Sequence, residues 1–80
     1  MTTVTLYSKP GCHLCDDALI ALQRVQKLQP FTLEKVNIDD DPALLSKYGD
    51  RIPVVLLNGR FLFDYQVDEA RLCALLEEVN

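Results

Sequence analysis

The 80-residue sequence has no tryptophan, a single histidine and no cluster of basic residues. Eight Lys and Arg residues against twelve Asp and Glu residues give a net charge of −4, so the basic surface typical of nucleic-acid-binding proteins is missing. The longest apolar stretches, such as residues 54–57, are far too short to cross a bilayer, and the first residues lack the pattern of a secretory signal. These absences predict a cytoplasmic protein that binds neither nucleic acid nor membranes.

Cysteine is also scarce, and the three cysteines are an odd number. Small secreted domains held together by disulfides carry an even set, so that class of protein is disfavoured. About half of the residues, 49%, are apolar, which is enough for one compact core in a chain of this length. We therefore expect a single domain over residues 1–80.

Apolar periodicity and turn residues predict seven elements along the chain. Alternation predicts a strand at 3–7, a second strand is expected at 31–38, and the runs 54–57 and 60–63 on either side of Asn58-Gly59 are expected as two further strands. Three-and-four spacing predicts helices at about 15–28 and after Asp68, and an Asp41-Pro42 start predicts a short helix between them. The second strand changes its apolar phase at Glu34-Lys35, as at a bulge or in an edge strand. Asn58-Gly59 predicts a type I′ hairpin turn, and Gly49 predicts a left-handed helix end.

The predicted order is β-α-β-α-β-β-α, an α/β fold. A helix crosses between the first two strands, so these two must be parallel, whereas the last two form a hairpin. A four-stranded mixed sheet flanked by the three helices, with helices on both faces, buries all of the apolar stripes.

Cys12 and Cys15 stand three positions apart between a Pro-Gly turn and the first helix. As a structural staple their disulfide would close a very short loop, which stabilises the fold by only about 2 kcal/mol before strain is subtracted. A zinc site needs four ligands, and only His13 and the distant Cys73 remain as candidates. A reactive dithiol is therefore the favoured hypothesis, with an idle dithiol in a binding module as the alternative.

Cys12 is expected where the first turn becomes the helix, so its sulfur faces unpaired N–H groups and the positive end of the helix dipole. Such a position stabilises a thiolate, which makes Cys12 the predicted nucleophile and Cys15 the resolving thiol. His13 either stabilises the thiolate as an imidazolium or is an exposed, tolerated side chain. The negative charges of Asp16 and Asp17 disfavour a thiolate, so we expect only a moderate stabilisation of the Cys12 thiolate.

The stretches Cys12-His13-Leu14-Cys15, "VNIDDDPALLSKYG" and Ile52-Pro53 together resemble the thioredoxin superfamily, and the small size resembles its glutaredoxin branch. The resemblance covers nearly the whole chain. It implies a thioredoxin-like fold and a thiol–disulfide oxidoreductase that serves redox homeostasis and electron transport. It also implies that Pro53 is cis and lies beside the dithiol, and that the backbone of Ile52 pairs with a substrate chain. An ordinary trans proline at a strand start is the alternative.

The same resemblance implies the cofactors and partners. It implies no bound cofactor and no metal, with glutathione as a reducing co-substrate or a thioredoxin-reductase-type protein as the electron source. The substrates would be proteins with disulfides or small thiol compounds, and the protein itself a monomer. Lys9 matches the basic residue that supports the thiolate and the glutathione carboxylate in glutaredoxins; a solvated lysine is the alternative.

The sequence also departs from the glutaredoxin pattern. The Gly-Gly and Asp that hold the γ-glutamyl end of glutathione are absent from "FLFDYQVDEARL". Asp68 could replace them, but an acid at a helix start is more often a cap. Cys73 is expected to be a half-buried thiol without a redox role.

Overall fold

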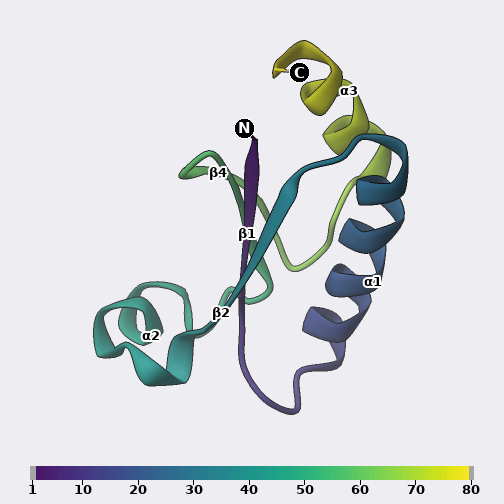
Figure 1. The fold of residues 1–80 in the computed structure, drawn as a ribbon. Helices are drawn as coiled ribbons and strands as arrows, with labels where there is room; N and C mark the ends of the chain where they lie inside the picture. Colours follow the sequence, from purple (N-terminus) through teal and green to yellow (C-terminus); the bar gives the residue numbers. More distant parts are fainter. Residues whose placement is uncertain (1, 80) are drawn as a thin grey trace.

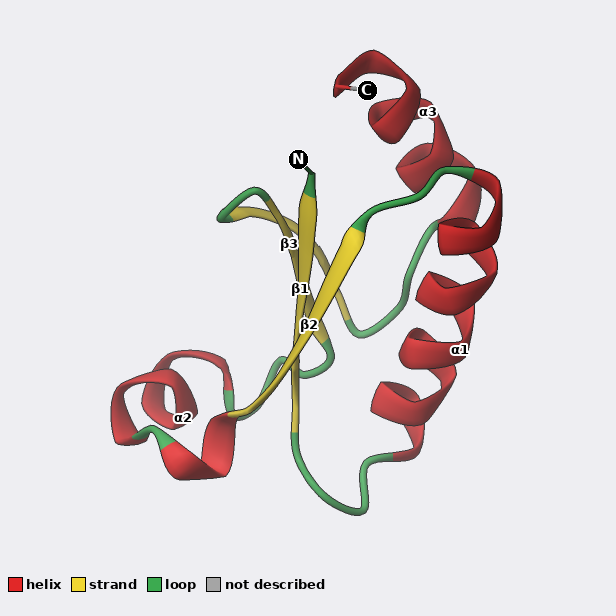
Figure 2. Ribbon diagram, viewed as in Figure 1, coloured by secondary structure: helices red, strands yellow, loops and turns green. Residues whose placement is uncertain are grey.

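The computed structural model describes residues 2–79, which form one mixed sheet with helices on both faces (Figures 1 and 2). In chain order the elements are β1 (Thr3–Ser8), α1 (His13–Leu28), β2 (Thr32–Asn37), the short 3-10 helix η1 (Ile38–Asp40), α2 (Pro42–Tyr48), β3 (Val54–Leu57), β4 (Arg60–Asp64) and α3 (Glu69–Val79). The predicted β-α-β-α-β-β-α order is confirmed, with η1 as an addition.

The strand order in the sheet is β2-β1-β3-β4, so β1 and β3 are central. β1 is parallel to β2 and β3 is antiparallel to β4, as the connections predicted. β1 also pairs with β3, and this pair is antiparallel. Tyr7, near the carboxyl end of β1, lies opposite Val54, the first residue of β3. The turn that follows β1 and the loop that precedes β3 therefore leave the sheet at the same end.

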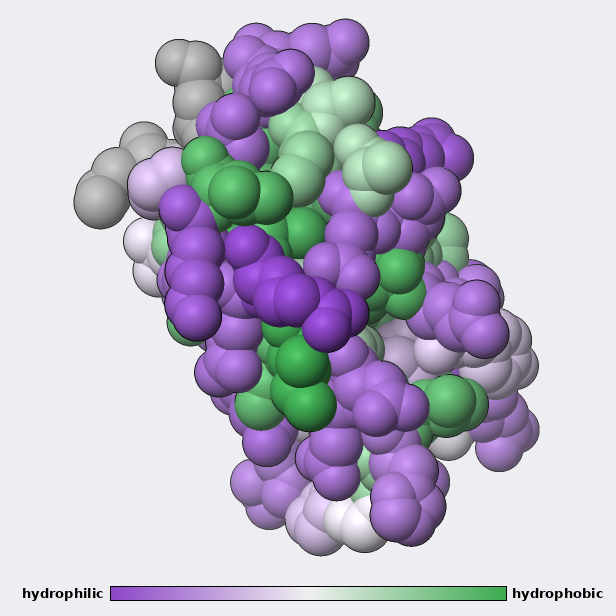
Figure 3. All heavy atoms as spheres, turned by 90° about the vertical axis from the view of Figure 1, so that its right-hand side faces the viewer, coloured by the Kyte–Doolittle hydropathy of each residue, from purple (hydrophilic) through white to green (hydrophobic). Residues whose placement is uncertain are grey.

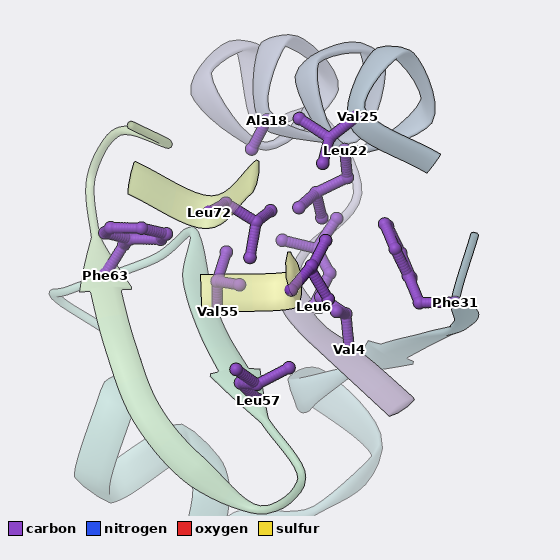
Figure 4. Packing of buried hydrophobic residues seen from close by; sticks show 11 residues of the cluster. Val4, Leu6, Ala18, Leu22, Val25, Phe31, Val55, Leu57, Phe63 and Leu72 are labelled. Atoms are coloured by element: carbon purple, nitrogen blue, oxygen red, sulfur yellow. The ribbon is translucent and has the colours of Figure 1, made fainter. Parts of the chain in front are cut away.

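The two faces of the sheet are covered unequally. Figure 1 shows α1 and α3 together on one face and the short α2 alone on the other. Strand alternation sends Val4 and Leu6 of β1 towards α1, where they belong to the larger hydrophobic cluster (Figure 4). That cluster consists of Val4, Leu6, Ala18, Leu22, Val25, Phe31, Val55, Leu57, Phe63, Leu72 and Leu76. The other face carries a cluster of four buried residues, Ile38, Tyr48, Val54 and Leu56.

The outer surface over α1 and α3 is mainly hydrophilic. Figure 3, which faces this side of the molecule, shows apolar side chains in separate patches divided by hydrophilic ones. The exposed apolar residues of α1 include Leu14, Ile20 and Leu28. Among residues 2–79, no helix has both the length and the apolar character that crossing a bilayer requires.

The prediction for Gly49 is wrong in its conformation. Gly49 follows α2 with a right-handed φ of −52°, and the chain winds on through a turn in which Arg51 N–H donates to Tyr48 C=O over 2.8 Å. A Cβ at this position would collide with the carbonyl oxygen of Leu45. Glycine therefore fits here because the backbone passes close by, and not because φ is positive.

The hairpin turn is confirmed, since Asn58 and Gly59 both have positive φ, 50° and 85°. The phase change in β2 reflects its place at the edge of the sheet: its register with β1 is continuous, and the irregularity lies between β3 and β4 at Val55/Leu56. β2 also ends at Asn37, so the predicted strand residue Ile38 starts η1 instead.

A dithiol at the start of a helix as the candidate active site

Cys12 is the N-cap of α1, which begins at His13, two residues earlier than periodicity predicted. Its backbone is extended, with φ −91° and ψ 109°, and its Sγ accepts a hydrogen bond from Cys15 N–H over 3.1 Å. Its carbonyl accepts the first helical bond, from Asp16 N–H, also over 3.1 Å. Cys12 Sγ thus occupies the position of a capping oxygen, where free N–H groups and the helix dipole favour negative charge.

Cys15 lies one turn along the helix and is joined to Cys12 as a disulfide, with the Cα atoms 5.2 Å apart. The two residues differ in accessibility: Cys15 is 4% exposed, whereas Cys12 is only half-buried. An attacking disulfide or thiol therefore reaches Cys12 before Cys15.

Lys9 precedes Cys12 by three residues, and His13 lies between the two cysteines in the sequence. Lys9 is half-buried and His13 is exposed, and neither side chain has an ion pair or hydrogen bond within residues 2–79. Lys9 borders a hollow of about 250 Å³ between the β1–α1 turn and the end of β2, which is lined by Ser8, Lys9, Pro10, Gly11, Asp16, Lys35 and Asn37. The proposed roles of Lys9 and His13 stay predictions.

The Ile52-Pro53 bond is cis, as the resemblance implied. Pro53 is fully buried and directly precedes Val54, which places it at the end of the sheet where the Cys12 turn also emerges. The side chain of Ile52 packs against the smaller cluster around Tyr48. Within residues 2–79, neither the N–H nor the C=O of Ile52 has a hydrogen-bond partner.

Three residues around this loop were not predicted as site residues. Arg51 Nε and a terminal guanidinium nitrogen both donate to one carboxylate oxygen of Asp64, over 3.2 and 3.0 Å. Tyr65 O–H donates to Asp50 C=O over 2.8 Å, and Tyr65 N–H donates to Pro53 C=O over 2.9 Å. No periodicity or motif marks these residues, because their contacts join segments more than ten residues apart.

A second hollow of about 250 Å³ lies between α1 and residues 65–69, the segment in which the glutaredoxin Gly-Gly and Asp are absent. Leu14, Asp17, Ala18, Ala21, Arg24, Tyr65, Gln66, Val67 and Glu69 line it. Arg24 and Glu69 form two hydrogen bonds across it, over 3.0 and 2.8 Å. These bonds, with the attraction between the charges, hold the pKa of Glu69 below its ordinary value and raise that of Arg24.

Asp68 accepts a hydrogen bond from Arg71 N–H over 3.1 Å at the start of α3, so it is a helix cap, as predicted. Cys73 is a free, half-buried thiol packed against the larger cluster. Among residues 2–79, no group of three or more His, Cys, Asp or Glu side chains is placed to hold a metal ion.

Comparison with solved structures shows the class of fold. Thioredoxin from Halobacterium salinarum is 22% identical and aligns with a TM-score of 0.69 over 96% of this chain and 73% of that one, so the two share the thioredoxin fold. An X-ray structure from X. campestris is 43% identical, with a TM-score of 0.77 over 94% of this chain and 96% of that one. A solution structure from Nitrosomonas europaea is 33% identical, with a TM-score of 0.82 over 92% of this chain and 89% of that one.

The family follows from the sequence comparison. The model of the glutaredoxin-like domain (DUF836) matches residues 3–77, so the chain belongs to this glutaredoxin-like family. An uncharacterized protein from Mycobacterium tuberculosis is 34% identical over 76 residues, 89% of this chain and 78% of that protein. A Dictyostelium discoideum protein named as glutaredoxin-like is 28% identical over 82 residues, 95% of this chain and 76% of that protein.

Proposed function

We propose that this protein is a thiol–disulfide oxidoreductase of the cytoplasm in which Cys12 is the nucleophile and Cys15 the resolving thiol. The observation that carries the proposal is the position of the pair: an accessible Cys12 caps the first helix, and a buried Cys15 lies in contact with it. Membership of a glutaredoxin-like family supports the same chemistry.

The reaction proceeds through two exchanges of a sulfur–sulfur bond. The Cys12 thiolate attacks one sulfur of a substrate disulfide, and the other sulfur leaves as a thiolate. The Cys15 thiolate then attacks Sγ of Cys12 and releases the first substrate sulfur, so the substrate gains two electrons and the protein becomes the Cys12–Cys15 disulfide. Donation from Cys15 N–H and the helix dipole stabilise the Cys12 thiolate at the start of the cycle and as a leaving group.

Two electrons must return to the pair before the next cycle. We propose glutathione as the reducing co-substrate, or a thioredoxin-reductase-type protein in its place, with no resident cofactor and a monomeric protein. Glutathione should serve poorly, because residues 65–69 offer no Gly-Gly and the Asp68 carboxylate is engaged as a helix cap. A coupled assay that compares the two electron sources tests this: low-micromolar affinity for glutathione would contradict the expected weakness.

The catalytic assignment is tested with single-cysteine variants and a disulfide-containing peptide. Cys12→Ser should abolish reduction of the peptide. Cys15→Ser should accumulate a mixed disulfide between Cys12 and the peptide, because the resolving thiolate is gone. Cys73→Ser is the matched control and should keep wild-type turnover. A wild-type protein that reduces no disulfide would overturn the assignment in favour of a binding module with an idle dithiol. Trapping of the peptide on Cys15 in the Cys12→Ser variant would instead exchange the roles of the two cysteines.

A further inference from the structure

Tyr65, the first residue after β4, holds the loop Asp50–Pro53 at both of its ends. At its first residue, Asp50 C=O accepts the bond from Tyr65 O–H, and at its last residue, Pro53 C=O accepts the bond from Tyr65 N–H. Between them, Arg51 is tied to the Asp64 carboxylate and its guanidinium lies 5.0 Å from the centre of the Phe61 ring. One tyrosine therefore spans the loop from end to end.

Tyr65 is an unusual residue for the backbone that it occupies. Its φ is +63°, and it forms the centre of a three-residue turn closed by Gln66 N–H donating to Asp64 C=O over 2.7 Å. Glycine or asparagine is the usual choice at positive φ, because a larger side chain raises the energy of this conformation. The Tyr65 side chain must therefore supply an interaction that glycine would not, and the hydroxyl bond to Asp50 is that interaction.

In the loop Asp50–Pro53, Ile52 is the residue whose backbone N–H and C=O are both unpaired within residues 2–79. Ile52 is fixed from one side by its packing against the smaller cluster. A free N–H and C=O on a fixed backbone can pair with an extended chain as the edge of a sheet does.

We propose that Tyr65 and Asp64 are positioning residues, which hold the Asp50–Pro53 loop so that the Ile52 backbone binds an extended substrate chain next to the dithiol. This inference rests on the proposed function, since it concerns the substrate of the same exchange reaction. Fixing the loop in advance lowers the entropy lost when a peptide binds. It contributes to the reaction of peptide disulfides and not to the reactivity of Cys12 itself.

The test compares two disulfides in single-turnover reactions of the reduced protein. One is an unstructured peptide with a disulfide flanked by several residues on each side, and the other is 5,5′-dithiobis(2-nitrobenzoic acid), which has no peptide backbone. Tyr65→Phe removes only the hydroxyl bond, and Asp64→Asn weakens the bond to Arg51. Each should lower the second-order rate constant for the peptide about 3- to 10-fold, the range expected for one lost hydrogen bond, and leave that for the small disulfide unchanged.

Two further variants separate positioning from folding. Glu69→Gln weakens the other ion pair, Arg24–Glu69, which does not touch the loop, and should leave both rate constants unchanged. Tyr65→Gly keeps the N–H bond to Pro53 and removes the energetic cost of positive φ, so its melting temperature should hold while the peptide rate constant falls. A merely structural tyrosine would lose stability without changing the ratio of the two rate constants.

The outcomes distinguish the two proposals. A wild-type protein that reduces neither disulfide overturns the proposed function and this inference with it. A wild-type protein that reduces both, with Tyr65→Phe at the wild-type peptide rate, overturns only the inference. Equal losses for the two disulfides in Tyr65→Phe overturn it as well, since they would show a general distortion of the dithiol. Tyr65→Phe decides the question if Asp64→Asn does not fold.

Discussion

The two hydrophobic clusters, one on each face of the sheet, have different relations to the dithiol. The larger cluster joins α1 and α3 to the strands through eleven buried residues. The smaller has four, beneath an α2 of seven residues, which spans only about 10 Å. The three residues of β1 that face this side, Thr3, Thr5 and Tyr7, are all half-buried, whereas Val4, Leu6 and Ser8 are buried.

The smaller cluster supports residues at the end of the sheet that carries the dithiol. Tyr7 and Ile52 pack against it, and the ring centres of Tyr7 and Tyr48 are 5.2 Å apart. It thus supports the loop that we propose as the substrate edge, whereas the larger cluster holds the helix that carries Cys12 and Cys15. We therefore expect substitutions in the larger cluster to act mainly on stability, and substitutions in the smaller cluster to act mainly on the proposed substrate edge.

The largest expected effect is a loss of stability in the larger cluster. Leu22 is fully buried, and Leu22→Ala should lower the free energy of unfolding by about 2 to 5 kcal/mol through lost burial and a cavity. Urea unfolding measures this loss. The reaction of Cys12 with iodoacetamide in the folded fraction should stay at the wild-type rate. A loss below about 1 kcal/mol would show that the larger cluster does not dominate stability.

The next effect concerns the dithiol itself. In the reduced protein, iodoacetamide should label Cys12 at least about tenfold faster than Cys15 or Cys73, because Cys12 is more accessible than the buried Cys15 and, unlike the half-buried Cys73, lies at a helix N-terminus. Mass spectrometry of peptides after limited labelling gives the order. Cys73→Ser is the control. Faster labelling of Cys15 would reverse the assignment of nucleophile and resolving thiol.

A substitution beside the smaller cluster tests whether the two faces of the sheet have different roles. Leu44 is half-buried against that cluster, so Leu44→Ala should cost only about 1 kcal/mol of stability. It should nevertheless lower the rate constant for a peptide disulfide about twofold or more, because the support of Ile52 loosens. Leu22→Ala, measured where it is folded, is the matched comparison. Equal peptide rates in the two variants would contradict the division between the faces.

The smallest expected effect is the pH dependence of the exposed Arg24–Glu69 pair. Its hydrogen bonds lower the pKa of Glu69 in the folded protein, so the pair stabilises the fold above the unfolded carboxyl pKa of about 4.3. The contribution is lost as pH falls through the lower, folded value. Arg24→Gln should therefore have a slightly lower melting temperature than wild type at pH 7 and low salt. That difference should shrink as the pH falls below about 4.3, and it should also shrink at high salt. A difference that is independent of pH would show that packing, and not charge, is responsible.

The sequence predicted the parts of this protein that depend on neighbouring residues. Strand alternation, helix spacing and the Asn58-Gly59 turn need only a few adjacent residues, and each of these predictions is confirmed. The position of Cys12 at a helix start followed from the Pro-Gly turn and the apolar stripe beyond it. The family pattern extended this local information to the cis bond at Pro53.

Tertiary structure decided what depends on residues far apart in the chain. Periodicity left open whether β2 has a bulge or lies at the edge of the sheet, and it could not show that Gly49 passes close to the carbonyl of Leu45 in a right-handed conformation. The bonds from Asp64 and Tyr65 to residues 50–53 join segments with no shared pattern, and a tyrosine gives no local sign of positive φ. Such contacts form only when the folded sheet brings the end of β4 beside the start of β3, because the energy that holds Tyr65 in this conformation comes from partners outside its own segment.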